Sequence, residues 1–111
     1  MEEVLEIQTA VGGIRVDALI ADYIMELVEG TRHAPGVDIG VSPRGSLALY
    51  RSAQAHAMIE GRDYVLPDDV KVMCRPVFLH RLVCRGGSDR GLDGHAARVL
   101  DEILRTVRVP V

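Results

Sequence analysis

The spacing of the apolar residues between positions 16 and 28 predicts an amphipathic helix, and no other pattern in this sequence is as regular. These residues recur three or four positions apart, which places them on one face of an α-helix: Val16, Leu19, Ile20, Tyr23, Ile24, Leu27 and Val28. Asp17 is the expected N-cap of this helix, and Gly30 together with the stretch 33–36 is expected to close it. An apolar face of this length is typical of a helix that packs in a bundle.

Similar patterns predict helices on both sides of this one. Residues 2–11 form a first helix, which Gly12 and the glycine after it end. Ser42 is expected to cap a further helix whose first residue is Pro43, because proline suits a position where the backbone N–H has no partner. This helix is apolar on most sides and rich in small residues until Gly61 stops it, so we expect it to be the central helix.

The remainder of the chain predicts shorter elements. An extended connector over residues 62–66 leads to a helix opened by Pro67, and Pro76 should break that helix near Arg75. A polar, glycine-rich loop follows over residues 84–91. A final helix, with Asp93 as candidate cap, carries one apolar face: Leu92, Ala96, Val99, Leu100, Ile103, Leu104 and Val107. The fold class is therefore all-α, a small helical bundle with short extended connectors.

Composition excludes several classes of function. The chain has 111 residues, which is one domain, and a net charge of -3 with only 4% aromatic residues. A nucleic-acid module usually carries a basic surface and stacking aromatics, so we expect no nucleic-acid partner. No apolar stretch approaches the ~20 residues that span a bilayer, so we expect no membrane partner. Two cysteines, Cys74 and Cys84, do not make a disulfide framework, so we expect a cytoplasmic protein.

The sequence also predicts that the chain is not an enzyme by itself. Lys71 is the only lysine and lies between two valines, whereas a phosphate-binding Walker loop needs lysine after a glycine run. Cys74, His80 and Cys84 lack the paired short spacings of a zinc site, so we expect no metal. The other histidines are scattered and suggest no catalytic arrangement: His33, His56 and His95.

Three segments, in this order and spacing, carry a specific resemblance. Residues 40–47 read GVSPRGSL, residues 61–70 read GRDYVLPDDV, and residues 80–82 read HRL. Together they resemble the C-terminal lid domain of MoxR-type AAA+ ATPases, and the likeness extends from Tyr23 to Leu104. The family usually has alanine where Val41 and Gly45 stand. It has a capping threonine where Leu66 stands, so the start of that helix should be looser here.

The resemblance implies a function as well as a fold. Proteins of this family have an ATP-hydrolysing core followed by a helical lid, form rings and act as chaperone-like remodelling machines that use ATP and Mg²⁺. They often work with partners that bear a von Willebrand factor A domain. Residues 1–14 would then be a connector from the ATPase core and residues 15–111 the lid, which would be inactive alone. Arg44, beside Ser42 and Pro43, matches the lid arginine called sensor 2, which contacts the nucleotide phosphates.

A second argument concerns Arg44 itself. A cation in the first turn of a helix opposes the helix dipole by roughly 0.3–1 kcal/mol, and such local conflicts are more frequent at functional sites. The alternative function is a helical interaction or dimerisation module that has no link to nucleotide. His80-Arg81 and Thr31-Arg32 either contact the core or a neighbouring subunit, or cap helix ends. We expect residues 62–64 to be structural, with Arg62 and Asp63 tying the connector and the ring of Tyr64 buried.

Overall fold

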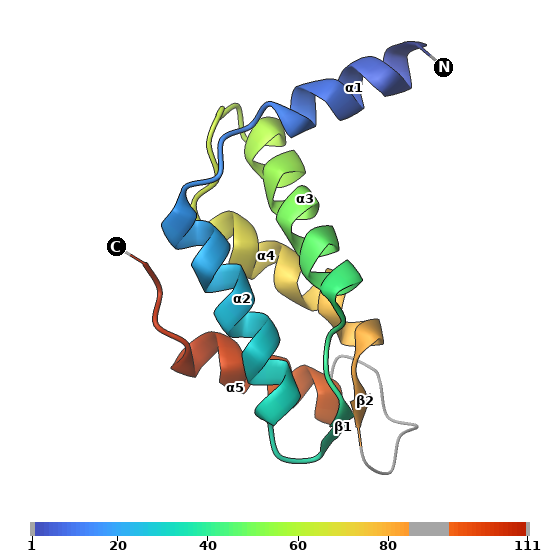
Figure 1. Cartoon of the computed structure of the whole chain (residues 1–111), viewed down its shortest axis with the longest axis vertical. Coiled ribbons are helices and arrows are strands. Elements are labelled where there is room, and N and C mark those ends of the chain that lie inside the picture. The colour runs from blue at the N-terminus through green and yellow to red at the C-terminus, as the bar shows by residue number, and fades with distance from the viewer. Residues whose placement is uncertain (1, 85–93, 111) are drawn as a thin grey trace.

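The helix predicted from the apolar spacing is α2, which spans Ala18–His33 in the computed structural model (Figure 1). The structure describes residues 2–84 and 94–110. Asp17 caps α2 as predicted, because its carboxylate accepts the backbone N–H of Leu19 at 2.9 Å. The prediction that Gly30 helps to end the helix is wrong. A Cβ at Gly30 would lie 3.1 Å from Cγ2 of Ile103, so this glycine lets the last helix pack closely.

The central helix is α3, Pro43–Ile59. It begins where the sequence predicts, with the Ser42 hydroxyl accepting the Gly45 backbone N–H at 3.3 Å. Its small and aliphatic residues Leu49, Ala53 and Ala57 are fully buried. Because α3 contacts α1, α2 and α4, its N-terminus occupies a defined place in the bundle.

The helix α4 spans Pro67–Phe78 and contains Pro76, so the predicted break near Arg75 is wrong. Val72 and Pro76 lie four residues apart on the exposed face of α4. Because proline has no backbone N–H, the Val72 carbonyl receives no helical hydrogen bond, but it lies on the solvent side of the helix. The α-helical hydrogen-bond pattern continues to Phe78, and a 3-10 helix, η1, then spans Leu79–Arg81. The start of α4 is also anchored rather than loose, because the Asp69 carboxylate accepts the backbone N–H of Leu66 at 2.7 Å.

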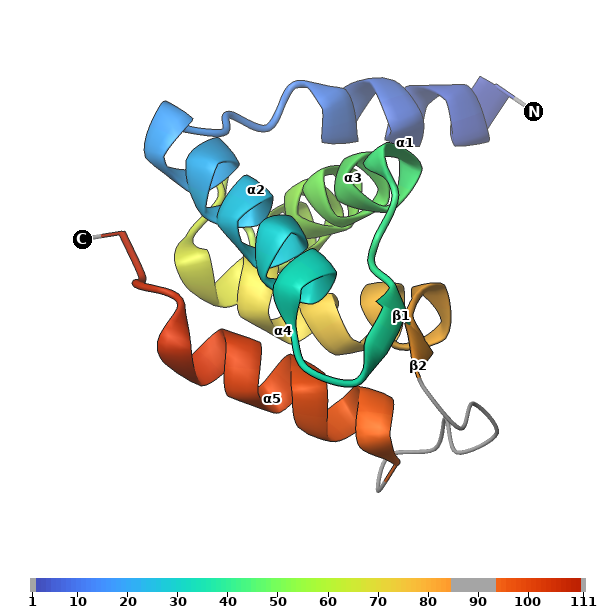
Figure 2. The ribbon, with the colours of Figure 1, turned by 60° about the horizontal axis from the view of Figure 1, so that its bottom comes forward.

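The helix α5, His95–Thr106, packs against α2 and α4 (Figure 2). Gly94 is its N-cap, and the predicted positions Leu92 and Asp93 lie outside the described residues, as does the predicted loop from residue 85 onward. The structure also contains two short strands that the sequence analysis did not predict. β1, Val37–Ile39, pairs antiparallel with β2, Val83–Cys84, so a minimal ribbon supplements the helices.

The first helix, α1, spans Glu2–Gly12 and projects from the bundle (Figures 1 and 2). The structure describes all of α1, and none of its residues is buried. Three large apolar side chains are exposed along it: Val4 at 53%, Leu5 at 54% and Ile7 at 56%. The chain therefore enters the bundle after α1.

The connector between α1 and α2 is held by the predicted extended segment before α4. The Arg15 backbone N–H donates to the Asp63 carbonyl at 2.8 Å, and the Val65 N–H donates to the Arg15 carbonyl at 2.9 Å. The Tyr64 ring is not buried, contrary to the prediction, since 43% of this residue is exposed. Within residues 2–84 and 94–110, no helix has the length and apolar character that crossing a bilayer requires.

Candidate functional site

The segment singled out by the sequence, Ser42-Pro43-Arg44, forms the start of α3. Ser42 has extended backbone angles and caps the helix, Pro43 is the first helical residue and Arg44 is the second. The first backbone N–H groups of a helix have no carbonyl partner within it and carry the positive end of the helix dipole. Arg44 thus adds a full positive charge to a place that is already electropositive.

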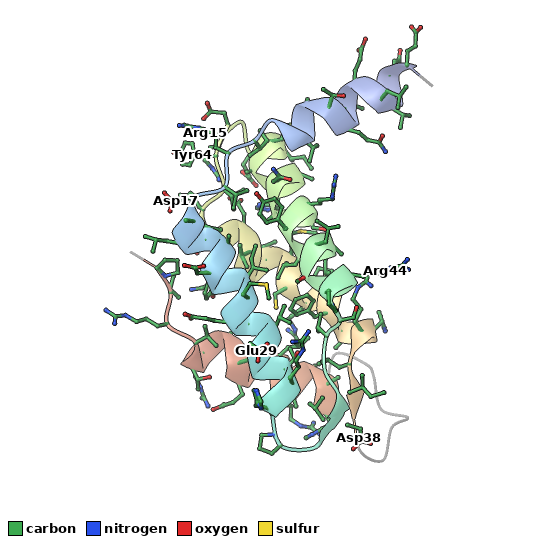
Figure 3. The ribbon with its side chains drawn as sticks, in the orientation of Figure 1. Arg15, Asp17, Glu29, Asp38, Arg44 and Tyr64 are labelled. Carbon is green, nitrogen blue, oxygen red and sulfur yellow. The ribbon has the colours of Figure 1, made fainter. Side chains whose placement is uncertain are left out.

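The guanidinium of Arg44 extends away from the bundle (Figure 3). The residue is exposed, and no hydrogen bond or ion pair joins its side chain to any residue in the described part of the chain. Arg51, which lies two turns further along α3, is also exposed. A guanidinium in this state retains all five of its N–H donors and can bind phosphate oxygens in a bidentate manner.

Buried contacts fix the backbone that leads into this helix start. The Thr31 hydroxyl donates to the Val28 carbonyl at 2.6 Å and accepts the Val41 backbone N–H at 3.0 Å. Both Thr31 and Val41 are fully buried. The end of α2 is therefore bonded to the residue that precedes Ser42.

Two glycines let the same segment approach its neighbours closely. A Cβ at Gly40 would lie 2.9 Å or less from the Arg32 backbone nitrogen and Cα. A Cβ at Gly45 would lie 2.3 Å from Cγ1 of Val41 and 3.3 Å from Cδ of Arg81. Val41 and Gly45, the two departures from the family's alanines, therefore contact each other, with the larger side chain filling the space left by the glycine.

A second cluster of charged residues lies inside the bundle, around Asp69. Arg62 donates two hydrogen bonds to its carboxylate, at 2.6 and 2.8 Å. His56 Nδ1 lies 2.6 Å from one of the Asp69 oxygens, and the Leu66 N–H reaches the other. The cluster joins α3, the connector and the first turn of α4.

The environment of Asp69 explains its protonation state. Burial alone would raise the pKa of this carboxyl, but the hydrogen bonds from Arg62, from the Leu66 backbone and from His56 lower it to about 2. The hydrogen bond to Asp69 likewise raises the pKa of Arg62 above its ordinary value. Since every carboxylate oxygen is engaged, the cluster has a structural role and leaves no group to react.

The structure separates the remaining residues that the sequence singled out. Arg81 Nε donates to the Val77 carbonyl at 3.0 Å, which is the helix-capping role that was one of its two alternatives. Cys74 is fully buried, where burial raises the pKa of its thiol to about 12, while His80 is exposed. Residues 2–84 and 94–110 contain no group of three or more histidine, cysteine or carboxylate side chains placed to hold a metal ion.

Sequence reasoning missed two contacts that build these sites. The Thr31 hydroxyl lies ten residues from the amide that it bonds, and no local motif marks such a pair. His56 was regarded as isolated, although it lies 13 residues before Asp69 in sequence. The usable signal was the location of Asp69 in the first turn of a helix, two residues after a proline, where a carboxylate is usually engaged by backbone N–H groups.

The sequence of the chain matches one protein family and several curated proteins. The model of the AAA lid domain family matches residues 29–103. The chain is 40% identical over 111 residues to the protein YeaC of Bacillus subtilis, which covers 99% of the chain and 34% of YeaC. It is 36% identical over 111 residues to the protein MoxR of Paracoccus denitrificans, covering 88% of the chain and 33% of that protein.

A third relative and one solved structure agree with these matches. The chaperone MoxR1 of Mycobacterium tuberculosis is 31% identical over 118 residues, covering 97% of the chain and 31% of that protein. A Cytophaga hutchinsonii protein assigned as an ATPase superposes with a TM-score of 0.87 at 28% identity, over 99% of the chain and 36% of that protein. The chain thus spans about a third of the length of the curated relatives that it matches.

Proposed function

The chain belongs to the AAA lid domain family and is the lid of a MoxR-type AAA+ ATPase, and from this premise we propose that Arg44 is its sensor 2 arginine. In this proposal Arg44 contacts the phosphates of the ATP that an ATPase core binds. Movement of the lid then follows the state of the nucleotide. ATP hydrolysis in the core supplies the free energy for chaperone-like remodelling of a client protein.

The observation that carries the proposal is the contrast between the position of Arg44 and its lack of partners. Among the residues that the structure describes, its guanidinium has neither a hydrogen bond nor an ion pair, although it projects from the second residue of a firmly packed helix. A stabilising arginine would be expected to pair with a carboxylate, as Arg62 does with Asp69. An arginine that binds a ligand has to keep its donors available.

The residues present fit a phosphate and leave the rest of the nucleotide to the core. The helix start supplies the electropositive end of a dipole and Arg44 supplies a planar fork of donors. In our proposal the core supplies the Walker loop and the carboxylates that hold Mg²⁺, because the sequence of this chain contains no Walker motif. The chain alone is then expected to bind ATP weakly and not to hydrolyse it.

The test is substitution of Arg44 in the ATPase that carries this lid. Arg44→Ala should lower the rate of ATP hydrolysis or the ATP affinity by about tenfold or more, the effect of losing a charge-assisted contact. Arg51→Ala is the matched control, since Arg51 is exposed on the same helix and should leave both quantities unchanged. Unaltered affinity and turnover in Arg44→Ala, measured by nucleotide titration and phosphate release, would overturn the proposal.

The same proposal includes partners outside this chain. A ring of ATPase subunits, and an associated protein with a von Willebrand factor A domain, are the partners that the family relationship suggests. The setting is the cytoplasm. Sedimentation of the ATPase with and without ATP, followed by co-purification with such a protein, measures both.

A second candidate function rests on α1. Its exposed Val4, Leu5 and Ile7 favour contact with another surface, either the ATPase core or a second copy of the chain in a nucleotide-independent dimer. Replacing these three residues by serine separates the candidates. A dimer of the 111-residue chain that dissociates on this replacement, combined with an Arg44→Ala ATPase of normal turnover, would favour the dimerisation module.

A further inference from the structure

Thr31 lies in the last turn of α2, and it is one of the few polar residues in the core. Its side chain is fully buried, and its hydroxyl uses both of its hydrogen-bonding abilities. It donates to the Val28 carbonyl at 2.6 Å and accepts from the Val41 amide at 3.0 Å. The first bond fixes the direction of the hydroxyl, so that its lone pair faces the incoming segment.

The amide that Thr31 accepts occupies a critical place in the chain. Val41 is fully buried, so its N–H has no access to water and would lose its partner if the hydroxyl were removed. The next residue is Ser42, which caps α3, and Arg44 follows within the first turn. The hydrogen bond therefore connects α2 to the backbone from which Arg44 projects.

Packing at the two neighbouring glycines reinforces this connection. The backbone of Gly40 lies so close to Arg32 that a Cβ would be 2.8 Å from Cα of Arg32. On the other side, Gly45 leaves room for the Val41 side chain. Helix α2 thus holds the start of this segment by one specific hydrogen bond, at Val41, and by the close contact of Arg32 with Gly40.

We propose that Thr31 is a positioning residue for Arg44: its hydroxyl sets the place and direction of the α3 start, and so determines where the guanidinium meets the nucleotide phosphates. The inference rests on the proposed function of Arg44. Displacement of a binding group by about 1 Å can cost a large factor in rate, and the hydrogen bond to the Val41 amide holds the backbone to α2 within three residues of Arg44. Thr31 itself does not contact the nucleotide.

The experiment uses three variants of the ATPase that carries this lid. Thr31→Val keeps the shape of the side chain and removes the hydroxyl, and it should weaken ATP affinity or turnover by about tenfold. Thr31→Ser keeps the hydroxyl and loses a methyl group, and it should retain activity within about threefold of the wild type. Thr106→Val is the control, because the Thr106 hydroxyl donates to the Glu102 carbonyl of its own helix and should have no effect.

Combination with Arg44→Ala distinguishes positioning from a general loss of stability. If Thr31 acts through Arg44, then Thr31→Val should cause less than about twofold further loss when Arg44 is already alanine, because coupled residues are not additive. Equal losses from Thr31→Val in both backgrounds would overturn the inference and leave the sensor 2 proposal intact. No effect of Arg44→Ala alone would overturn the sensor 2 proposal, and this inference with it.

Hydrogen exchange on the 111-residue chain gives a readout that does not depend on activity. Thr31→Val should speed the exchange of the Val41 amide, and of the Gly45 and Ser46 amides in the first turn of α3, more than that of amides near the middle of α3. Thr31→Ser should keep the wild-type pattern. A uniform increase across all of α3 in Thr31→Val would mean general destabilisation and would overturn the positioning role.

Discussion

Two arginines of this domain are used in opposite ways. Arg62 donates two hydrogen bonds to a fully buried carboxylate, Asp69. Arg44 extends from the first turn of α3 without a partner among the described residues. The sequence already predicts a structural role for Arg62 and a ligand-binding role for Arg44, and the structure shows that Arg62 is paired and that Arg44 has no partner among the described residues.

The difference separates a cluster that supports the fold from the residue that we propose binds nucleotide. The Arg62 guanidinium neutralises the charge of the fully buried Asp69, and the cluster joins α3, the connector and α4. The charge of Arg44 is unpaired at a helix start, where it is unfavourable for the helix. Stability should therefore depend strongly on Asp69 and little on Arg44, whereas nucleotide affinity should show the reverse order.

The largest expected effect is at Asp69. Asp69→Ala should lower the free energy of unfolding by about 3 kcal/mol, because Arg62 and His56 lose their partner in the interior. Chemical denaturation of the 111-residue chain measures this loss. Asp63→Ala is the control, since this carboxylate is 77% exposed and lies 3.6 Å from Arg15, and it should change stability by less than about 0.5 kcal/mol. Equal effects of the two substitutions would remove the distinction between the two regions.

A pH titration of stability probes the same cluster. Asp69 has its pKa lowered from 3.8 to about 2 in the folded chain, so its contribution is complete above the unfolded pKa and is lost as the pH falls. The difference corresponds to about 2.5 kcal/mol. Stability should therefore fall between about pH 5 and pH 2, and Asp69→Asn should remove this part of the decrease. An unchanged acid profile in Asp69→Asn would contradict the assignment.

The next prediction concerns how firmly the Arg44 segment is held. Gly45→Ala should destabilise the chain by about 1 kcal/mol, because the new Cβ would meet Cγ1 of Val41 at 2.3 Å and the overpacking outweighs the better helix propensity of alanine. In a Val41→Ala background the 2.3 Å contact is gone and the closest remaining atom is Cδ of the exposed Arg81 at 3.3 Å, a side chain that can shift, so the same Gly45→Ala change should be stabilising. Thermal unfolding of the four chains measures this change of sign. A Gly45→Ala effect that is equal in both backgrounds would show that the two positions do not compensate.

Much of the fold follows from local signals in the sequence. Asp17, Ser42 and Pro67 mark helix starts because capping chemistry depends on a few adjacent residues. Local reasoning failed at Pro76, where the orientation of the helix determines the cost. On the exposed face of α4, the carbonyl released by proline can be hydrated, and the helix continues to Phe78. The apolar spacing of Val70, Cys74 and Phe78 places Pro76 on the opposite face, a signal that the prediction of a break did not use.

The candidate site also combines features that local sequence predicts with features that depend on packing. The position of Arg44 in the first turn of α3 could be predicted from Ser42 and Pro43, but its role in nucleotide binding stays a prediction. The bond from Thr31 to Val41 could not be foreseen, because it depends on how α2 and α3 pack. The exposure of Tyr64 was also not predicted, because an aromatic ring in an extended connector can face either the core or the solvent.

The last prediction concerns the stability of the Arg44→Ala variant, where the direction of a small change tells the two arginines apart. Arg44→Ala removes a cation from the positive end of α3 and introduces the best helix former, so it should raise the free energy of unfolding by about 0.3 kcal/mol. Arg51→Ala makes the same chemical change in the middle of α3, where the dipole has little effect, and serves as the reference. The difference between the two variants, measured by denaturation at low salt, should diminish at high salt as the dipole is screened. A loss of more than about 1 kcal/mol in Arg44→Ala would mean that the arginine supports the fold, and the division between the two regions would fail.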